Sequence, residues 1–351
     1  MINLRSDTAA KRSEEMLQFA MAAQSGNMGH QGCPSVERLQ AKAARLFGAE
    51  AALFTYGGTK SNQIALRLHA PPRSKVFCAA TSHIDSFAEA VFAIEPIKIQ
   101  AIDAKRGAIT PDLLNNVLEE QMSRDYAASP SLLVLENTMG YRGGEVYPYE
   151  TLAQVSELAR KNGLKVHVDG ARIWHASIVE DRPLSDYMKH ADTISVCLAK
   201  ALGAPQGSVL LGDAATIDRA KIAQRQLGDN MYCVGHLAAA GEFAIDNNRA
   251  SLAEDHEKAG RFQEILKSSS DITTMHERPP TNMVLFNVSV LRGTRTSNKA
   301  EGFTQRLAEQ SGVQLYSLPK HWVRVVAHSG VSMEETEQAA HLTAELINAM
   351  E

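Results

Sequence analysis

Two residues of opposite charge follow apolar runs of this sequence, and their types suit the chemistry of an organic cofactor. Lys200 lies in CLAKALGAPQGS, and Asp169 ends the run in VHVDGAR. A partly desolvated lysine has a lowered pKa and can form an imine with a carbonyl group. A carboxylate at the end of a buried strand needs a partner, either a helix N-terminus or a protonated pyridine nitrogen. Each residue alone is a weak signal, but together they predict a cofactor whose cationic ring accepts electrons.

A glycine turn could hold the anionic part of such a cofactor. Gly57, Gly58 and Thr59 stand between an apolar run and a helical pattern, where backbone N–H groups and the helix dipole can accept a phosphate. The same residues could also form a plain turn. They match neither the GxGxxG fingerprint nor the Walker loop, which disfavours a nicotinamide dehydrogenase.

Three further residues could contact the cofactor or a substrate. His83 follows an apolar run, so it is either a structural histidine or a ring that lies flat on an aromatic cofactor. Arg172 comes three residues after Asp169, and Arg324 lies inside the apolar stretch WVRVVAH. Both arginines could form internal salt bridges or hold a substrate carboxylate with two hydrogen bonds.

Short apolar strands alternate with helices over the first two thirds of the chain. Strands are predicted at 51–56, 75–79, 131–136, 164–168, 193–198 and 208–211, and helices at 34–48, 62–68, 111–122 and 149–162. This alternation predicts an α/β fold with a mostly parallel sheet, and such sheets bind ligands at the carboxyl ends of their strands. Gly58, Thr59, His83, Asp169 and Lys200 all follow predicted strands.

The pattern changes past about residue 245. Helices are predicted at 253–267, 304–311 and 333–350, and strands at 282–288 and 322–327. We therefore expect a large domain over residues 1–245, whose N-terminal segment contributes to the active site. A smaller C-terminal α+β domain is expected over residues 246–351.

The composition is that of an ordinary soluble protein. The 351 residues are 44% hydrophobic and 22% charged, and a formal net charge of −4 argues against a nucleic-acid binder. No apolar run reaches the roughly 18 residues that span a bilayer, and MINLRSDT is unlike a secretion signal, which predicts a cytoplasmic protein. The four cysteines form no CxxC pair, so no metal site is expected.

Several stretches carry a resemblance to a known family. They are NLRSDT (3–8), EAALF (50–54), SHI (82–84), LENT (135–138), HVDGARI (167–173), CLAKALGAPQGS (197–208), LAAAG (237–241), EDH (254–256), TNM (281–283) and VRVVAH (323–328). Together they resemble the threonine aldolase branch of the β-eliminating lyase family, which belongs to the fold type I enzymes that depend on pyridoxal 5'-phosphate. The resemblance runs from end to end, and HVDGAR followed by the lysine stretch is its most specific part.

The resemblance implies how the cofactor is held. Lys200 would carry it as a Schiff base, Asp169 would pair with the pyridine nitrogen, and His83 would stack on the ring. Gly58 and Thr59 would bind its phosphate.

The resemblance also implies how the substrate is held. Ser6, Arg172 and Arg324 would bind the carboxylate of a small amino acid, and Arg172 could also reach the cofactor. His30 stands where the family carries a tyrosine, which makes it a candidate substrate-binding residue.

The implied reaction is retro-aldol cleavage of a threonine-like β-hydroxy-α-amino acid, through a quinonoid, to glycine and an aldehyde. His83 or an ordered water would take the proton of the β-hydroxyl group. Family members are homodimers or homotetramers with shared active sites. A transaldolase, a β-eliminating lyase or a racemase would need the same lysine and aspartate, and a non-catalytic binding protein of the same fold is a further alternative.

Some positions depart from the family. Residues 26–35 read GNMGHQGCPS in place of an acidic, tyrosine-containing stretch, and Met139 replaces a histidine. Tyr232 stands where an arginine would help bind the phosphate, so Arg225 or Lys60 would have to compensate. Because these changes cluster around the predicted pocket, we infer a divergent member whose substrate could differ from threonine.

Overall fold

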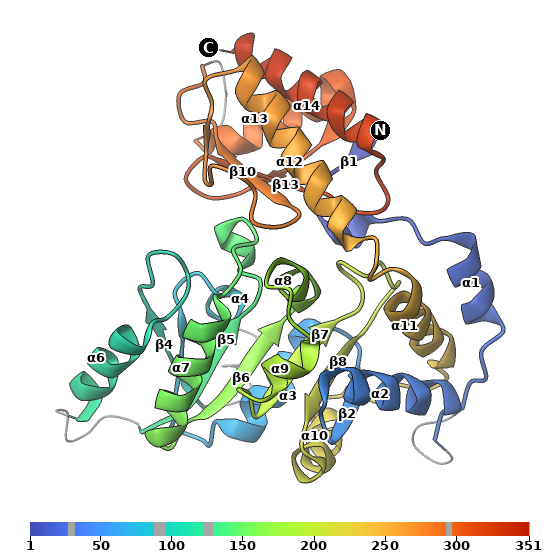
Figure 1. Ribbon diagram of the computed structural model, residues 1–351, viewed down its shortest axis with the longest axis vertical. Coiled ribbons are helices and arrows are strands. Elements are labelled where there is room, and N and C mark those ends of the chain that lie inside the picture. Colours follow the sequence, from blue (N-terminus) through green and yellow to red (C-terminus); the bar gives the residue numbers. More distant parts are fainter. Residues whose placement is uncertain (27–31, 88–95, 123–128, 293–296, 351) are drawn as a thin grey trace. The chain divides into compact units, whose positions relative to one another are not determined.

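The computed structural model describes residues 1–26, 32–87, 96–122, 129–292 and 297–350, which form two compact units (Figure 1). Unit 2 comprises Ser13–Asn247. Unit 1 comprises Met1–Arg12 together with Asn248–Glu351. The N-terminal segment, which the sequence assigned to the large domain, therefore groups with the C-terminal part of the chain.

A seven-stranded sheet forms the centre of unit 2, with the strand order β2-β8-β7-β6-β5-β3-β4. Its strands are β2 (Ala51–Thr55), β3 (Lys75–Ala79), β4 (Lys98–Ile102), β5 (Pro130–Glu136), β6 (Lys165–Gly170), β7 (Thr193–Cys197) and β8 (Ser208–Gly212). β8 runs antiparallel to both neighbours, and the other neighbouring pairs are parallel. The predicted mostly parallel sheet is confirmed, and the carboxyl ends of β2, β3, β5, β6 and β7 meet at one edge.

Helices cover this sheet because the strands bury nearly every side chain. α3 (Gly58–His69) and α10 (Ala214–Gln226) share an apolar cluster with β2 and β8, α2 (Pro34–Phe47) packs on β2, and α7 (Tyr149–Lys161) packs on β5 and β6. Figure 1 shows β5, β6 and β7 side by side, with helices around them. The other helices of the unit are α1 (Glu14–Met21), α4 (His83–Phe87), α6 (Pro111–Met122), α8 (Ile173–Val179), α9 (Leu184–Met188) and α11 (Gly235–Asn247), with a short 3-10 turn at Gly140–Arg142.

Unit 1 is an α+β unit. β1 (Ile2–Asn3) pairs in parallel with β11 (Val313–Gln314), which ties the N-terminal segment to this unit. A four-stranded antiparallel sheet has the order β12 (Tyr316–Ser317), β13 (Trp322–Val326), β10 (Met283–Asn287), β9 (Thr273–Thr274). The helices α12 (Leu252–Ser269), α13 (Lys299–Ser311) and α14 (Met333–Asn348) share one apolar core with this sheet, and Asp7–Ala9 form a 3-10 turn.

Local signals explain where several helices begin and end. α6 begins at Pro111, and Thr110 Oγ1 accepts a hydrogen bond from the Leu113 N–H at 3.3 Å, as an N-cap does. α3 begins at Gly58, four residues before the pattern predicted, because its first turn is polar and carries no apolar stripe. In the part of the chain that the structure describes, no helix is long and apolar enough to cross a bilayer.

Candidate active site

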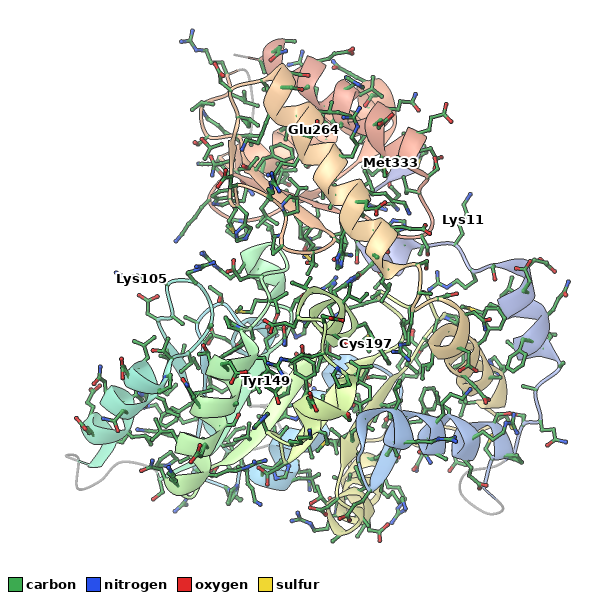
Figure 2. The ribbon with its side chains drawn as sticks, viewed as in Figure 1. Lys11, Lys105, Tyr149, Cys197, Glu264 and Met333 are labelled. Carbon is green, nitrogen blue, oxygen red and sulfur yellow. The ribbon has the colours of Figure 1, made fainter. Side chains whose placement is uncertain are left out.

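The predicted cofactor residues of unit 2 follow strands that end at the same edge of the sheet. Asp169 is the fifth residue of β6, and Lys200 comes three residues after Cys197, the last residue of β7, which is labelled in Figure 2. His83 begins α4 after β3, and Gly58 begins α3 after β2. Because these strands are parallel to one another, the topology places all four residues at one edge.

Two hydrogen bonds orient the Asp169 carboxylate. The side chain is buried, at 2% exposure. Its Oδ2 accepts from Asn62 Nδ2 at 2.7 Å, and its Oδ1 accepts from the Ala171 N–H at 3.1 Å. These two bonds fix the position of the carboxylate, so Asp169 is oriented to pair with a cation at the end of β6.

Glu136 places a second carboxyl group beside Asp169. The two residues face each other across β5 and β6, and Glu136 is 7% exposed. Its Oε2 accepts from the His83 N–H at 2.5 Å, and its Oε1 accepts from the Gly140 N–H at 2.9 Å. Burial, and after it the charge of Asp169, raise the pKa of Glu136 to about 7. Sequence reasoning gave this glutamate no role, although it lies in the quoted LENT stretch.

The Glu136 carboxyl group should make folding stability depend on pH. Its ordinary pKa is 4.5, so between about 4.5 and about 7 the folded state binds more protons than the unfolded state. Wild-type stability should therefore fall as pH rises through this window, by the order of 1–3 kcal/mol relative to Glu136→Gln, which cannot titrate. Urea unfolding of both proteins at about pH 5 and about pH 8 measures the difference.

The Glu136→Gln side chain keeps one acceptor and loses the other, so some stability is lost equally at both pH values. Only the change of the difference with pH reports the titration. If the two proteins lose or gain stability in parallel between the two pH values, Glu136 does not titrate in that window.

Lys200 and Arg172 both lie within electrostatic reach of His83. Burial lowers the pKa of His83, and the charges of Lys200 and Arg172 lower it further against the opposing effect of Asp169. The imidazole is therefore neutral near pH 7 and can accept a proton. Arg172 is 6% exposed, and a β-carbon at Gly140 would lie 3.7 Å from both its Nη1 and the Oε1 of Glu136. Lys200 is half-buried.

The first turn of α3 offers space for an anion. Gly57 precedes the helix, and no side chain caps its first N–H groups. A β-carbon added at Gly58 would meet no atom within 4 Å, so the space beside Gly58 is open. The uncapped N–H groups of this turn are the kind of donor that a phosphate requires.

Arg225 lies beside a different opening. It is exposed in the last turn of α10 and lines a cavity of about 330 Å³ together with Asp229 and Tyr232. Lys60 Nζ donates to the carbonyl oxygen of Leu227 at 3.2 Å, so Lys60 links the first turn of α3 to the segment that leads into Asp229. Tyr232 is 57% exposed.

Ser6 and Arg324, the two predicted carboxylate-binding residues outside unit 2, both belong to unit 1. Ser6 Oγ accepts from the Thr8 N–H at 3.3 Å. Arg324 lies in β13, its Nη2 donates to the carbonyl oxygen of Arg5 at 3.1 Å, and its guanidinium lies 4.6 Å from the centroid of the Tyr316 ring. Arg324 therefore fixes the backbone next to Ser6. His30 lies outside the described residues.

Sequence reasoning also missed a row of buried polar residues behind Asp169. Asn62 Oδ1 contacts His167 Nε2 at 3.0 Å, and His167 Nδ1 contacts Thr193 Oγ1 at 2.9 Å. Thr193 Oγ1 in turn contacts His69 Nε2 at 3.2 Å. His167 stands in the quoted HVDGAR stretch, but no local signal tells that Asn62, from α3, is its partner.

Comparison with known proteins gives consistent results over nearly the whole chain. Residues 3–290 match the beta-eliminating lyase family. The low specificity L-threonine aldolase of Escherichia coli O157:H7 is 35% identical over 97% of this chain and 98% of its own length. The low-specificity L-threonine aldolase 1 of Arabidopsis thaliana is 30% identical over 95% of this chain and 93% of its own.

A solved structure supports the fold. The threonine aldolase of Leishmania major superposes with a TM-score of 0.82 at 19% identity, over 99% of this chain and 100% of that one. The chain has the fold type I architecture that the sequence predicted.

Proposed function

The chain belongs to the beta-eliminating lyase family, and from this premise we propose that it is a pyridoxal-phosphate-dependent aldehyde-lyase. It would cleave a threonine-like β-hydroxy-α-amino acid to glycine and an aldehyde. The observation that carries the proposal is the buried, doubly hydrogen-bonded Asp169 carboxylate at the same sheet edge as Lys200 and the open first turn of α3.

The residues of this edge fit pyridoxal phosphate. The cofactor has an aldehyde, a basic ring nitrogen and a phosphate, and the edge offers an amine, a carboxylate and an uncapped helix N-terminus. Three buried polar atoms near these strand ends also make no hydrogen bond within the described ranges: Oγ1 of Thr81, Nδ2 of Asn137 and Oγ1 of Thr138. Such groups are costly to bury unless a ligand or water satisfies them.

When bound, pyridoxal phosphate supplies a carbon that amines attack and a cationic ring that accepts the electron pair of a breaking bond. Lys200 would hold the cofactor through its Nζ until the substrate amine takes its place, and would then be an amine that can carry a proton. Asp169 would keep the ring nitrogen protonated through an ion pair. Gly58 and Thr59 would direct their N–H groups at the phosphate.

The remaining residues would act on the substrate. Because burial keeps His83 neutral near pH 7, its ring could take the proton of the β-hydroxyl group, directly or through a water. Arg172 would contribute a guanidinium to the substrate carboxylate or the cofactor, and Arg324 and Ser6 would serve the carboxylate. Lys60, in the first turn of α3, would add positive charge near the phosphate in place of the arginine that Tyr232 replaces, because Arg225 lies beside a different opening. As the resemblance implies, the protein would form a homodimer or homotetramer, and we propose that it acts in the cytoplasm.

Product analysis tests the proposed reaction. The purified protein, loaded with pyridoxal phosphate, is mixed with L-threonine, L-allo-threonine, phenylserine and L-serine, and glycine, aldehyde, ammonia and keto acid are quantified. We expect glycine and aldehyde in equal amounts from at least one β-hydroxy amino acid, with a substrate other than threonine preferred if the altered pocket residues determine specificity.

Two results would contradict the aldolase assignment. Ammonia and a keto acid in place of glycine would identify β-elimination. A requirement for an added acceptor aldehyde before any donor is cleaved would identify a transaldolase.

A further inference from the structure

The polar residues behind Asp169 form one continuous chain of side-chain hydrogen bonds. The links join Asp169 to Asn62 (2.7 Å), Asn62 to His167 (3.0 Å), His167 to Thr193 (2.9 Å) and Thr193 to His69 (3.2 Å). All five residues are buried, at 6% exposure or less. Such a row is costly in a sheet protein, because each polar group must give up water, so every group needs a partner of the right type.

The donor and acceptor atoms of each group determine the direction in which every hydrogen bond of this row runs. An ionised carboxylate only accepts, so Asn62 must turn its NH₂ group toward Asp169 and its oxygen toward His167. His167 must then carry its proton on Nε2, and its bare Nδ1 must accept from the Thr193 hydroxyl. The hydroxyl proton of Thr193 is thereby used, so His69 must donate to Thr193 from Nε2. All four donors point toward Asp169.

Both histidines suit this arrangement. Burial lowers the pKa of His167 and that of His69 to about 4, so each imidazole is neutral near pH 7. A neutral imidazole has one donor and one acceptor nitrogen, which is what a link inside a directed chain needs. A protonated His167 would present a second donor to Thr193 and would break the order of the chain.

We propose that Asn62 and His167 are positioning residues that hold the Asp169 carboxylate aimed at the ring nitrogen of the cofactor. This inference rests on the proposed function. Asn62 lies one helical turn after Gly58 on α3. The same rigid helix therefore carries the proposed phosphate-binding turn and the support of the carboxylate, and it sets the spacing between the two ends of the cofactor.

The tautomers can be measured without any catalytic assay. Nitrogen-15 NMR of histidine-labelled protein, with His167→Gln and His69→Gln for assignment, distinguishes Nδ1–H from Nε2–H. We expect both residues to be neutral and protonated on Nε2 near pH 7. If His167 carried its proton on Nδ1, its Nε2 would accept from the Asn62 NH₂ group and the Asn62 oxygen would face Asp169. That result would overturn the proposal.

A variant pair then tests the role toward the cofactor. Asn62→Leu removes the donor to Asp169, and we expect about tenfold to hundredfold weaker binding of pyridoxal phosphate by absorbance titration, the effect of losing one hydrogen bond to a buried charge. Ser195→Ala is the matched control, because Ser195 faces Asp169 from β7 but is not part of the chain of hydrogen bonds. The Ser195→Ala protein should bind pyridoxal phosphate as the wild type does.

Folding is checked by circular dichroism and thermal unfolding of the cofactor-free proteins. If Asn62→Leu does not fold, Thr193→Val against Thr193→Ser provides the second pair: the valine breaks the chain, the serine keeps its hydroxyl, and only the valine should weaken binding. A folded Asn62→Leu protein with wild-type affinity would overturn the positioning role alone. A wild-type protein that binds no pyridoxal phosphate would overturn the proposed function as well.

Discussion

Lys200→Ala is expected to abolish the visible absorbance band of bound pyridoxal phosphate and to lower kcat by at least about a thousandfold. The variant removes both the amine that would hold the cofactor and a group that would carry a proton. Positioned proton transfer alone contributes roughly 10²–10⁴-fold to catalysis, and the loss of the covalent link adds to this. Absorbance spectra and glycine release, measured on the same samples, give both quantities.

Lys105→Ala is the control for this variant. Lys105 is an exposed lysine of unit 2, labelled in Figure 2, and its removal should change neither the band nor kcat. Circular dichroism shows whether both variants fold. If the Lys200→Ala protein retained the wild-type band, another amine would hold the cofactor and the assignment of Lys200 would be wrong.

Asp169→Asn should lower kcat by about 10²–10³-fold, the range found when one preorganised electrostatic group is removed from an active site. The substitution keeps the shape of the side chain but removes its charge, so the ring nitrogen of the cofactor would lose the proposed ion pair that keeps it protonated. In the wild type, Asn62 Nδ2 donates to Asp169 Oδ2 at 2.7 Å. The substitution replaces one of the two accepting carboxylate oxygens with an NH₂ group, so one of the donors to Asp169 loses its acceptor. Steady-state kinetics with the best substrate of the panel give the ratio.

Asp192→Asn is the matched control. Asp192 Oδ2 accepts from the Val166 N–H of β6, three residues before Asp169 on the strand. The Asp192→Asn substitution should lower the stability of the fold but leave kcat within about twofold, because removing a charge outside the site removes no contact with the transition state. Equal losses in the two variants would mean that Asp169 acts only through the fold.

The sheet of unit 2 could be read from the sequence wherever its strands are buried on both faces. β5 (PSLLVLE) and β7 (TISVC) are mostly apolar and buried, and their bounds fall within one residue of the prediction. β4 went unnoticed because four of the five residues of KIQAI, at the sheet edge, are exposed or partly exposed and the stretch resembles a loop. α11 went unnoticed as well, since its small apolar residues give little amphipathic contrast.

The site was predictable to the extent that its residues follow strands. Asp169 and Lys200 stand at strand ends and have distinctive chemistry, so position and type were enough to nominate them. Asn62 and His167 owe their role to a contact between α3 and β6, and residues more than 100 positions apart leave no local trace of such a pairing. Glu136 could have been nominated by the strand-end argument, since it ends β5 as Asp169 nearly ends β6.

The discontinuity of unit 1 has a consequence for how the chain folds during synthesis. Unit 2 is complete once residue 247 has been made, whereas β1 can pair only when β11 exists. Because domains generally fold as units while the ribosome elongates, the sheet with Asp169 and Lys200 can assemble early. Ser6 would meanwhile remain on an unpaired N-terminal segment and would reach its place beside Arg324 only near the end of translation. These two proposed substrate-binding residues would therefore come together after the sheet of unit 2 has formed.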